Sequence, residues 1–161
     1  MWGGDGHRMV CGVAWQRLTT DGRALATRLL GSTDEKTFVD ACVWADSVRN
    51  DRPESYNYHF INIPAGARGM DIDLCAAPKR CAPWAIVHFG HVLGDAKADH
   101  TARVEALKWV LHFVGDLHQP LHATNLFSSR WPQGDRGGLL RKDRDRDRGD
   151  QAIDPGLATA L

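Results

Sequence analysis

Eight histidines stand out in this chain of 161 residues, because imidazole is the commonest metal ligand in proteins and titrates near neutral pH. One run, residues 111–122, reads LHFVGDLHQPLH. On a helix, His112 and Asp116 would lie one turn apart on the same face, where they can bind one ion. His122 follows Pro120, which ends or kinks a helix, so its side chain could turn back toward the same place.

A His with an Asp four residues later is by itself a weak signal, because such a pair is more often a surface pair than a pair of ligands. Here the pair borders the apolar face of Leu111, and a buried carboxylate beside histidines needs the compensation that a metal ion supplies. Gly115 would also let a ligand or another backbone come close. Both the surface pair and the metal site remain open at this point.

Three further candidates each have an ordinary structural alternative. Asp46 could form an exposed ion pair with Arg49, His59 could be a core histidine, and His7 could be a capping or exposed residue. Together with the run at 111–122, these residues offer only nitrogen and oxygen ligands, a mixture that suits zinc. A zinc ion with an open coordination position would be hydrolytic rather than structural.

Apolar residues recur at three- and four-residue spacing in five segments, which predicts five helices. These segments lie at about 10–18, 25–30, 38–48, 83–93 and 101–114. Asp34 would cap the third helix and Pro83 would occupy the first turn of the fourth. Residues 50–81 form an irregular stretch, in which residues 58–63 could be a short strand without a convincing partner. The expected fold is an all-α, mostly helical single domain with one long irregular loop.

The composition changes after Gly138. Residues 1–138 form the expected domain, whereas residues 139–161 contain an alternating-sign charge run and no aromatic residue. This charged, low-complexity tail is expected to be disordered or a solvated helix. Twenty basic and twenty acidic residues leave no net charge, which excludes a strongly basic nucleic-acid coat or membrane-surface protein. No apolar run approaches the ~20 residues of a membrane span, and no protein partner is implied.

The four cysteines give information about the cellular compartment of the protein, because disulfides persist where conditions are oxidising. Cys75 and Cys81 lie in a polar, Pro-flanked stretch that favours a small disulfide-closed loop, with two unpaired thiols as the alternative. Cys11 and Cys42 lie among apolar residues and are expected to be buried thiols. No signal peptide follows Met1, so the protein is either cytosolic or a mature exported chain, and the cysteine usage favours the second.

Four motifs, taken in order, resemble a known family. They are Trp2-Gly-x-x-Gly-His7, Trp44-Ala-Asp46-x-x-Arg49, Tyr58-His59-Phe60 and the run at 111–122, of which the last is the most specific. They resemble the zinc-dependent nucleases of the S-one/P-one class (mung bean nuclease type) over about residues 2–138. The resemblance implies a mostly helical fold shared with zinc phospholipase C, cleavage of single-stranded DNA and RNA, often 3′-nucleotidase activity, and a secreted or periplasmic location.

The resemblance also implies roles for individual residues around a cluster of up to three zinc ions. The implied zinc ligands are Trp2, His7, Asp46, His59, His112, Asp116 and His122. Asp116 would bridge two ions. Arg49 and Asp46 would be the catalytic residues, and Arg49 would contact the scissile phosphate. Phe60 would stack on a nucleobase and Asn62 would hydrogen-bond it.

Two features depart from the family pattern. Met1 precedes Trp2, so the Trp2 amino group would be a peptide nitrogen that cannot ligate zinc. The Gly134-Asp-x-Gly-Gly138 pattern matches, but no histidine follows His122, and the segment from residue 139 resembles a shifted reading frame or a premature end. We therefore expect one or two zinc ions. A phospholipase C-like hydrolase and a non-catalytic zinc-binding remnant remain as alternatives.

Overall fold

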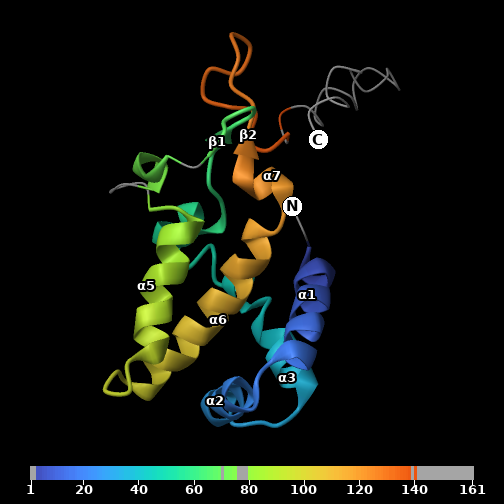
Figure 1. The fold of residues 1–161 in the computed structure, drawn as a ribbon, viewed down its shortest axis with the longest axis vertical. Helices are drawn as coiled ribbons and strands as arrows, with labels where there is room; N and C mark the ends of the chain where they lie inside the picture. The colour runs from blue at the N-terminus through green and yellow to red at the C-terminus, as the bar shows by residue number, and fades with distance from the viewer. Residues whose placement is uncertain (1–2, 70, 76–79, 139, 141–161) are drawn as a thin grey trace.

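The computed structural model describes residues 3–69, 71–75, 80–138 and 140 of this mostly helical domain (Figure 1). Its longest helix, α6 (His100–Leu117), runs through the middle of the fold, with α5 (Ala82–Gly94) on one side and α1 (Gly4–Arg17) on the other. The predicted mostly helical single domain is thereby confirmed. None of the helices in the described part is long and apolar enough to cross a membrane. The expected tail at 139–161 falls outside the described residues, except for residue 140.

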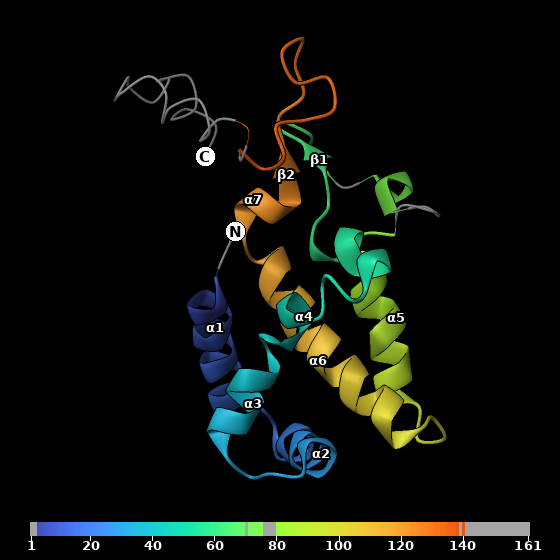
Figure 2. The same cartoon turned by 180° about the vertical axis from the view of Figure 1, so that it is seen from behind.

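The helices α2 (Thr20–Leu30) and α3 (Glu35–Ala41) follow α1 and lie at the end of the domain away from β1 and β2 (Figure 1). The single turn of α4 (Trp44–Ser47) instead lies against α6, as the opposite view shows (Figure 2). This arrangement brings the short α4 against the middle of the longest helix.

Local signals set several helix boundaries as predicted. Asp34 caps α3 by accepting a hydrogen bond from the Lys36 amide at 3.1 Å, and Pro83 lies in the first turn of α5. The cap of α6 was not predicted: the helix begins at His100, one residue before the expected Thr101, and Asp99 caps it by accepting a hydrogen bond from the Thr101 amide at 2.8 Å. α6 ends at Leu117, and the short α7 (Pro120–Ala123) begins with the proline that was expected to end or kink it.

The single helix predicted over 38–48 is wrong, because the chain breaks it between Ala41 and Trp44. At the break, the carbonyl oxygen of Cys42 lies 2.7 Å from Nδ1 of His112. The spacing of apolar residues continues through the break, so periodicity predicts one continuous helix. It does not reveal that the Cys42 carbonyl forms a hydrogen bond with a side chain distant in the sequence.

The stretch at 50–81 is more ordered than predicted. It contains the 3₁₀ helices η1 (Pro53–His59) and η2 (Ile72–Cys75) and the strand β1 (Ile63–Pro64). β1 pairs in parallel with β2 (Thr124–Asn125), with Ile63 opposite Thr124. The expected strand therefore lies at the end of the predicted segment and does have a partner. A two-residue strand shows no alternation from which that partner could be predicted.

The apolar core divides into two main clusters around α6. Between α1, α2, α3 and α6 the buried residues are Cys11, Trp15, Ala26, Leu29, Phe38, Cys42 and Leu107. Between α4, η1, α5 and α6 they are Ala45, Tyr58, Ala85, Trp109 and Phe113. Because both clusters pack on α6, that helix also buries two polar residues, His112 and Asp116.

Both cysteine pairs form disulfides. Cys75 is bridged to Cys81, in agreement with the small loop predicted from the sequence. Cys11 on α1 is bridged to Cys42 after α3, so the expectation of two buried thiols is wrong. Apolar surroundings suit a buried thiol and a buried disulfide equally, and only the packing of α1 against α3 brings the two sulfur atoms together.

Candidate metal centre and adjoining cavity

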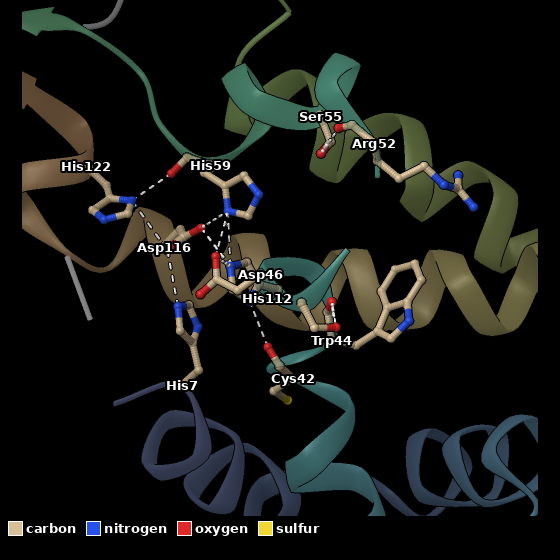
Figure 3. A network of polar contacts seen from close by, with 11 residues as sticks. His7, Cys42, Trp44, Asp46, Arg52, Ser55, His59, His112, Asp116 and His122 are labelled. Atoms are coloured by element: carbon tan, nitrogen blue, oxygen red, sulfur yellow. Dashed lines mark hydrogen bonds and ion pairs between the residues drawn. The ribbon is translucent and has the colours of Figure 1, made fainter. Parts of the chain in front are cut away.

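Four side chains from separate parts of the fold converge beside α6 (Figure 3). Asp46 comes from α4 and His59 from the end of η1, while His112 and Asp116 come from successive turns of α6. Nδ1 of His59 lies 3.1 Å from Nε2 of His112 and 3.0 Å from Oδ2 of Asp116. Nε2 of His112 lies 3.1 Å from the same Asp116 oxygen. Oδ1 of Asp46 lies 3.8 Å from the His59 nitrogen and 3.6 Å from the His112 nitrogen.

The spacing of these four atoms fits the coordination shell of one small cation. Ligand atoms bound at zinc distances in a tetrahedron are about 3.3 Å apart. The separations given above run from 3.0 to 3.8 Å, on both sides of that value. Two imidazoles and two carboxylates are also donors that suit zinc. His59, His112 and Asp116 can therefore hold a metal ion without rearrangement of the fold, and Asp46 lies at the edge of this group, close enough to His59 and His112 to complete it.

Asp116 faces further nitrogen atoms through its other oxygen. Oδ1 lies 3.4 Å from Nε2 of His7 and 3.3 Å from Nδ1 of His122. The His7 ring also stacks on the His112 ring, with 3.9 Å between their centroids. His7, Asp46 and His112 form another group that could hold an ion, and this group shares Asp46 and His112 with the cluster described above. The Asp116 carboxylate therefore faces His59 and His112 through one oxygen and His7 and His122 through the other.

The surroundings favour the metal-binding protonation states of Asp116 and His59. Burial by itself raises the pKa of Asp116, but hydrogen bonds from three surrounding histidines outweigh it and hold the pKa far below its usual range. Burial is the largest influence on His59 and lowers its pKa. At neutral pH Asp116 is therefore a carboxylate and His59 a neutral imidazole, the forms in which each acts as a ligand. For His112, burial lowers the pKa, but the hydrogen bond and the charge of Asp116 outweigh it and raise the pKa, so this ring must lose a proton when a metal binds.

Backbone carbonyls orient two of the histidines. Nδ1 of His112 lies 2.7 Å from the Cys42 oxygen, and Nδ1 of His122 lies 2.7 Å from the His59 oxygen. A carbonyl accepts only from a protonated nitrogen, so when each ring is neutral, as a metal ligand must be, its proton lies on Nδ1 and its lone pair on Nε2. For His112, Nε2 is the atom that faces the cluster. The Cys11–Cys42 disulfide thus links the carbonyl that orients this ligand to α1, which carries His7.

A cavity of about 340 Å³ adjoins the cluster, and His59 belongs to both. Other residues that line it include Arg49, Tyr56, Asn57, Phe60, Asn62, His122, Asn125 and Arg136. The Arg49 guanidinium lies over the Tyr56 ring, 4.6 Å from its centroid, and Tyr56 packs edge-on against Phe60. The volume suits a small-molecule ligand. Two guanidinium groups, aromatic faces and side-chain amides suit an anion that carries a planar, polar ring.

The structure brings together the predicted site residues that it describes. His7, Asp46, His59, His112, Asp116 and His122 lie in or beside the metal centre, and Arg49, Phe60 and Asn62 line the cavity. Trp2, the remaining predicted ligand, lies outside the described residues. Among the described residues, neither group that could hold a metal includes His122. The histidines without a predicted role, His88, His91, His100 and His118, are exposed.

The sequence analysis missed Asn125 and Arg136 as cavity residues. A signal was available, because Arg136 lies inside the Gly134-Asp-x-Gly-Gly138 pattern, whose backbone turns at Gly134, Arg136, Gly137 and Gly138 have positive φ. The pattern marks a sharply turning segment, and such segments often shape a site. It does not reveal which distant residues the segment will meet.

Comparisons with known proteins identify the family of the chain. The model of the S1/P1 nuclease family matches residues 2–142. The chain is 32% identical over 130 residues to Nuclease S1 of Aspergillus oryzae and 32% identical over 132 residues to Endonuclease 2 of Arabidopsis thaliana. It is 29% identical over 126 residues to Nuclease P1 of Penicillium citrinum. These three matches cover 78%, 76% and 75% of the chain but 45%, 46% and 47% of the relatives.

The chain thus spans about half the length of the curated relatives it matches. The family match nevertheless extends over most of the chain, and it includes the described elements that carry the metal centre and the cavity. The resemblance predicted from the four sequence motifs is confirmed, and the chain belongs to the S1/P1 nuclease family.

Proposed function

We propose that this chain is a zinc-dependent nuclease that hydrolyses phosphodiester bonds of single-stranded DNA and RNA. One observation carries the proposal: the cavity that contains Arg49 and Phe60 shares His59 with the metal-binding group formed by His59, His112 and Asp116. A nucleotide in the cavity would therefore have its phosphate within reach of both the metal centre and a guanidinium. The same arrangement would accept a 3′-mononucleotide, which supports an additional 3′-nucleotidase activity.

The metal centre would supply the nucleophile, because bound zinc lowers the pKa of water toward ~7 and provides hydroxide at neutral pH. The role of Asp46, His59, His112 and Asp116 is to hold the ion, and the Cys42 carbonyl keeps one of these ligands in the correct tautomer. His7 and the second Asp116 oxygen support a second ion. We propose one or two ions for the described ligand set, with His122 available to a third.

Arg49 and Phe60 would bind the two ends of a nucleotide. The Arg49 guanidinium can donate two parallel hydrogen bonds to phosphate oxygens and stabilise the charge that builds up during hydrolysis. Phe60 would stack on the base, and Asn62 would form a hydrogen bond with it. An aromatic face reaches only an unstacked base, which explains a preference for single strands. Since the cavity supplies its own cations, a chain without net charge can still bind nucleic acid.

Two disulfides support a secreted or periplasmic location, because such bonds persist in oxidising compartments. No membrane or protein partner forms part of the proposal. Single-stranded nucleic acid and nucleotides are the proposed ligands.

The test compares zinc-loaded protein with Phe60→Ala on denatured and native DNA. We expect the unmodified chain to cleave denatured DNA preferentially. Phe60→Ala should weaken mononucleotide binding by about 1–3 kcal/mol while zinc content is unchanged. Phe127→Ala is the control, because Phe127 is exposed and is not among the residues that line the cavity.

The outcome also separates the alternatives. Unchanged nucleotide affinity in Phe60→Ala would count against the base site, whereas loss of zinc would show that Phe60 serves the core. Hydrolysis of phosphatidylcholine instead of DNA would favour the phospholipase C-like reaction. Zinc binding without hydrolysis of either substrate would indicate a non-catalytic zinc-binding chain.

A further inference from the structure

Two asparagines meet at the wall of the cavity. Asn62 directly precedes β1, and Asn125 is the second residue of β2. Nδ2 of Asn125 donates a hydrogen bond to Oδ1 of Asn62 at 3.0 Å. Both residues line the cavity, yet Asn62 is exposed whereas Asn125 is only 2% exposed. The buried amide is therefore in a position to orient the exposed one.

The backbone holds Asn125 from one side, and Gly134 confines its amide from another. The main-chain carbonyl of Asn125 accepts a hydrogen bond from the Ala65 amide at 2.9 Å, beside the pairing of β1 with β2. A Cβ built at Gly134 would lie 2.4 Å from Nδ2 of Asn125, and Gly134 has a φ of +87°, so this position requires glycine. Reciprocal hydrogen bonds between Leu126 and Asp135, each 3.0 Å, keep the glycine in place.

This contact accounts for a motif that the proposed function leaves unused. In the Gly134-Asp-x-Gly-Gly138 pattern, Gly134 packs against the Asn125 amide. Asp135 anchors the chain beside it through its hydrogen bond with Leu126. Farther along, a Cβ at Gly137 would lie 2.1 Å from the carbonyl oxygen of Leu121, so this glycine also permits a close approach. The motif thus fixes the segment against the strand that carries Asn125.

The direction of the hydrogen bond decides what Asn62 presents to a ligand. An amide side chain has an acceptor oxygen and a donor nitrogen, and here the oxygen is engaged by Asn125. Asn62 is left with Nδ2 as the group available to the cavity. Oδ1 of Asn125 is buried and has no hydrogen-bond partner within the described part of the chain, so Nδ2 of Asn62 is the polar group that the pair presents to a ligand.

We propose that Asn125 is a positioning residue that sets the hydrogen-bond polarity of Asn62 and thereby selects among nucleobases. The inference rests on the proposed function, in which Asn62 contacts the base. Substitution by aspartate tests it sharply, because an ionised carboxylate accepts hydrogen bonds and cannot donate them. In Asn125→Asp, Asn62 must turn its amide over to donate through Nδ2, and its oxygen then faces the cavity.

The experiment measures the dissociation constants of adenosine and inosine 5′-monophosphates for the zinc-loaded full chain by calorimetry. Adenine and hypoxanthine have the same outline but exchange donor and acceptor at two adjacent edge positions. We expect the ratio of the two constants to invert in Asn125→Asp, with a shift of about tenfold or more, because a hydrogen bond is exchanged for an unpaired polar group. In Asn125→Ala the ratio should approach one, because the Asn62 amide is then free to turn.

Asn57→Asp is the matched control, because it adds the same charge to the same cavity at an exposed position. It should weaken both nucleotides while leaving their ratio unchanged. Zinc content and circular dichroism check that each variant is folded, and Asn125→Ala carries the test if Asn125→Asp does not fold.

The two proposals fail in distinguishable ways. An unchanged ratio in the folded Asn125 variants, while Phe60→Ala still weakens binding, overturns the role of Asn125 and leaves the proposed base site intact. Unchanged binding in Phe60→Ala overturns the proposed base site itself. Inversion in Asn57→Asp as well as in Asn125→Asp would show that added charge is the cause, which also overturns the inference.

Discussion

Nδ1 of His112 lies 2.7 Å from the main-chain carbonyl oxygen of Cys42, at the break between α3 and α4. The same cysteine is bridged to Cys11, one turn of α1 beyond His7. A covalent crosslink therefore lies directly behind a hydrogen bond that orients a candidate metal ligand. The disulfide should contribute to metal binding as well as to stability.

Replacing Cys11 and Cys42 by serine should lower the free energy of unfolding by about 3–4 kcal/mol, because the crosslink closes a loop with a sequence separation of 31. It should also weaken zinc binding. The control replaces Cys75 and Cys81, whose separation of 6 predicts a smaller loss of about 2 kcal/mol. Urea denaturation and zinc calorimetry make the comparison, and equal zinc affinities in the two variants would contradict the coupling.

Asp116→Asn should remove more zinc than any other single substitution among the described ligands. The carboxylate turns one oxygen toward His59 and His112 and the other toward His7, and an amide keeps only one oxygen and no charge. Zinc stoichiometry by elemental analysis is the measurement. Asp46→Asn is the comparison, because the Asp46 side chain is 35% exposed and lies at the edge of the cluster. Full zinc content in Asp116→Asn would rule out the bridging role.

Gly115→Ala should disturb His7, although the substitution favours helix formation. A Cβ at position 115 would lie 3.2 Å from Nδ1 of His7, so the imidazole must shift by a few tenths of an ångström. We expect weaker binding of the second zinc. Gly90→Ala in α5 is the control, because no atom lies within 4 Å of its Cβ, and it should raise stability by about 1 kcal/mol with zinc unchanged. Thermal unfolding and zinc titration of both variants test this, and identical titrations would refute it.

Arg49→Lys should lower kcat by about 10²- to 10³-fold while zinc content stays unchanged, because lysine cannot form the paired hydrogen bonds of a guanidinium. Arg52→Lys is the matched control. Arg52 points away from the metal centre (Figure 3) and pairs with Glu105 at 3.3 Å. Steady-state kinetics on denatured DNA distinguish the two positions, and equal losses of kcat would show that Arg49 acts only through the fold.

Features that depend on short-range geometry could be predicted from the amino-acid sequence. The spacing of His112 and Asp116 places both on one face wherever a helix forms, and the helix that carries them could be predicted from apolar periodicity. Asp34 and Pro83 marked the beginnings of two helices because capping depends on neighbours within one turn. The ordered motifs were also enough to predict the nuclease family.

The contacts between distant segments, in contrast, became known only from the folded structure. It paired Cys11 with Cys42, gave β1 its partner, and brought Asn125 against Asn62 with Gly134 behind it. None of these contacts follows from periodicity, because periodicity assigns a residue to a face and not to a partner. Each contact depends on how the helices pack around α6, and that packing depends on the shapes of all the core side chains together.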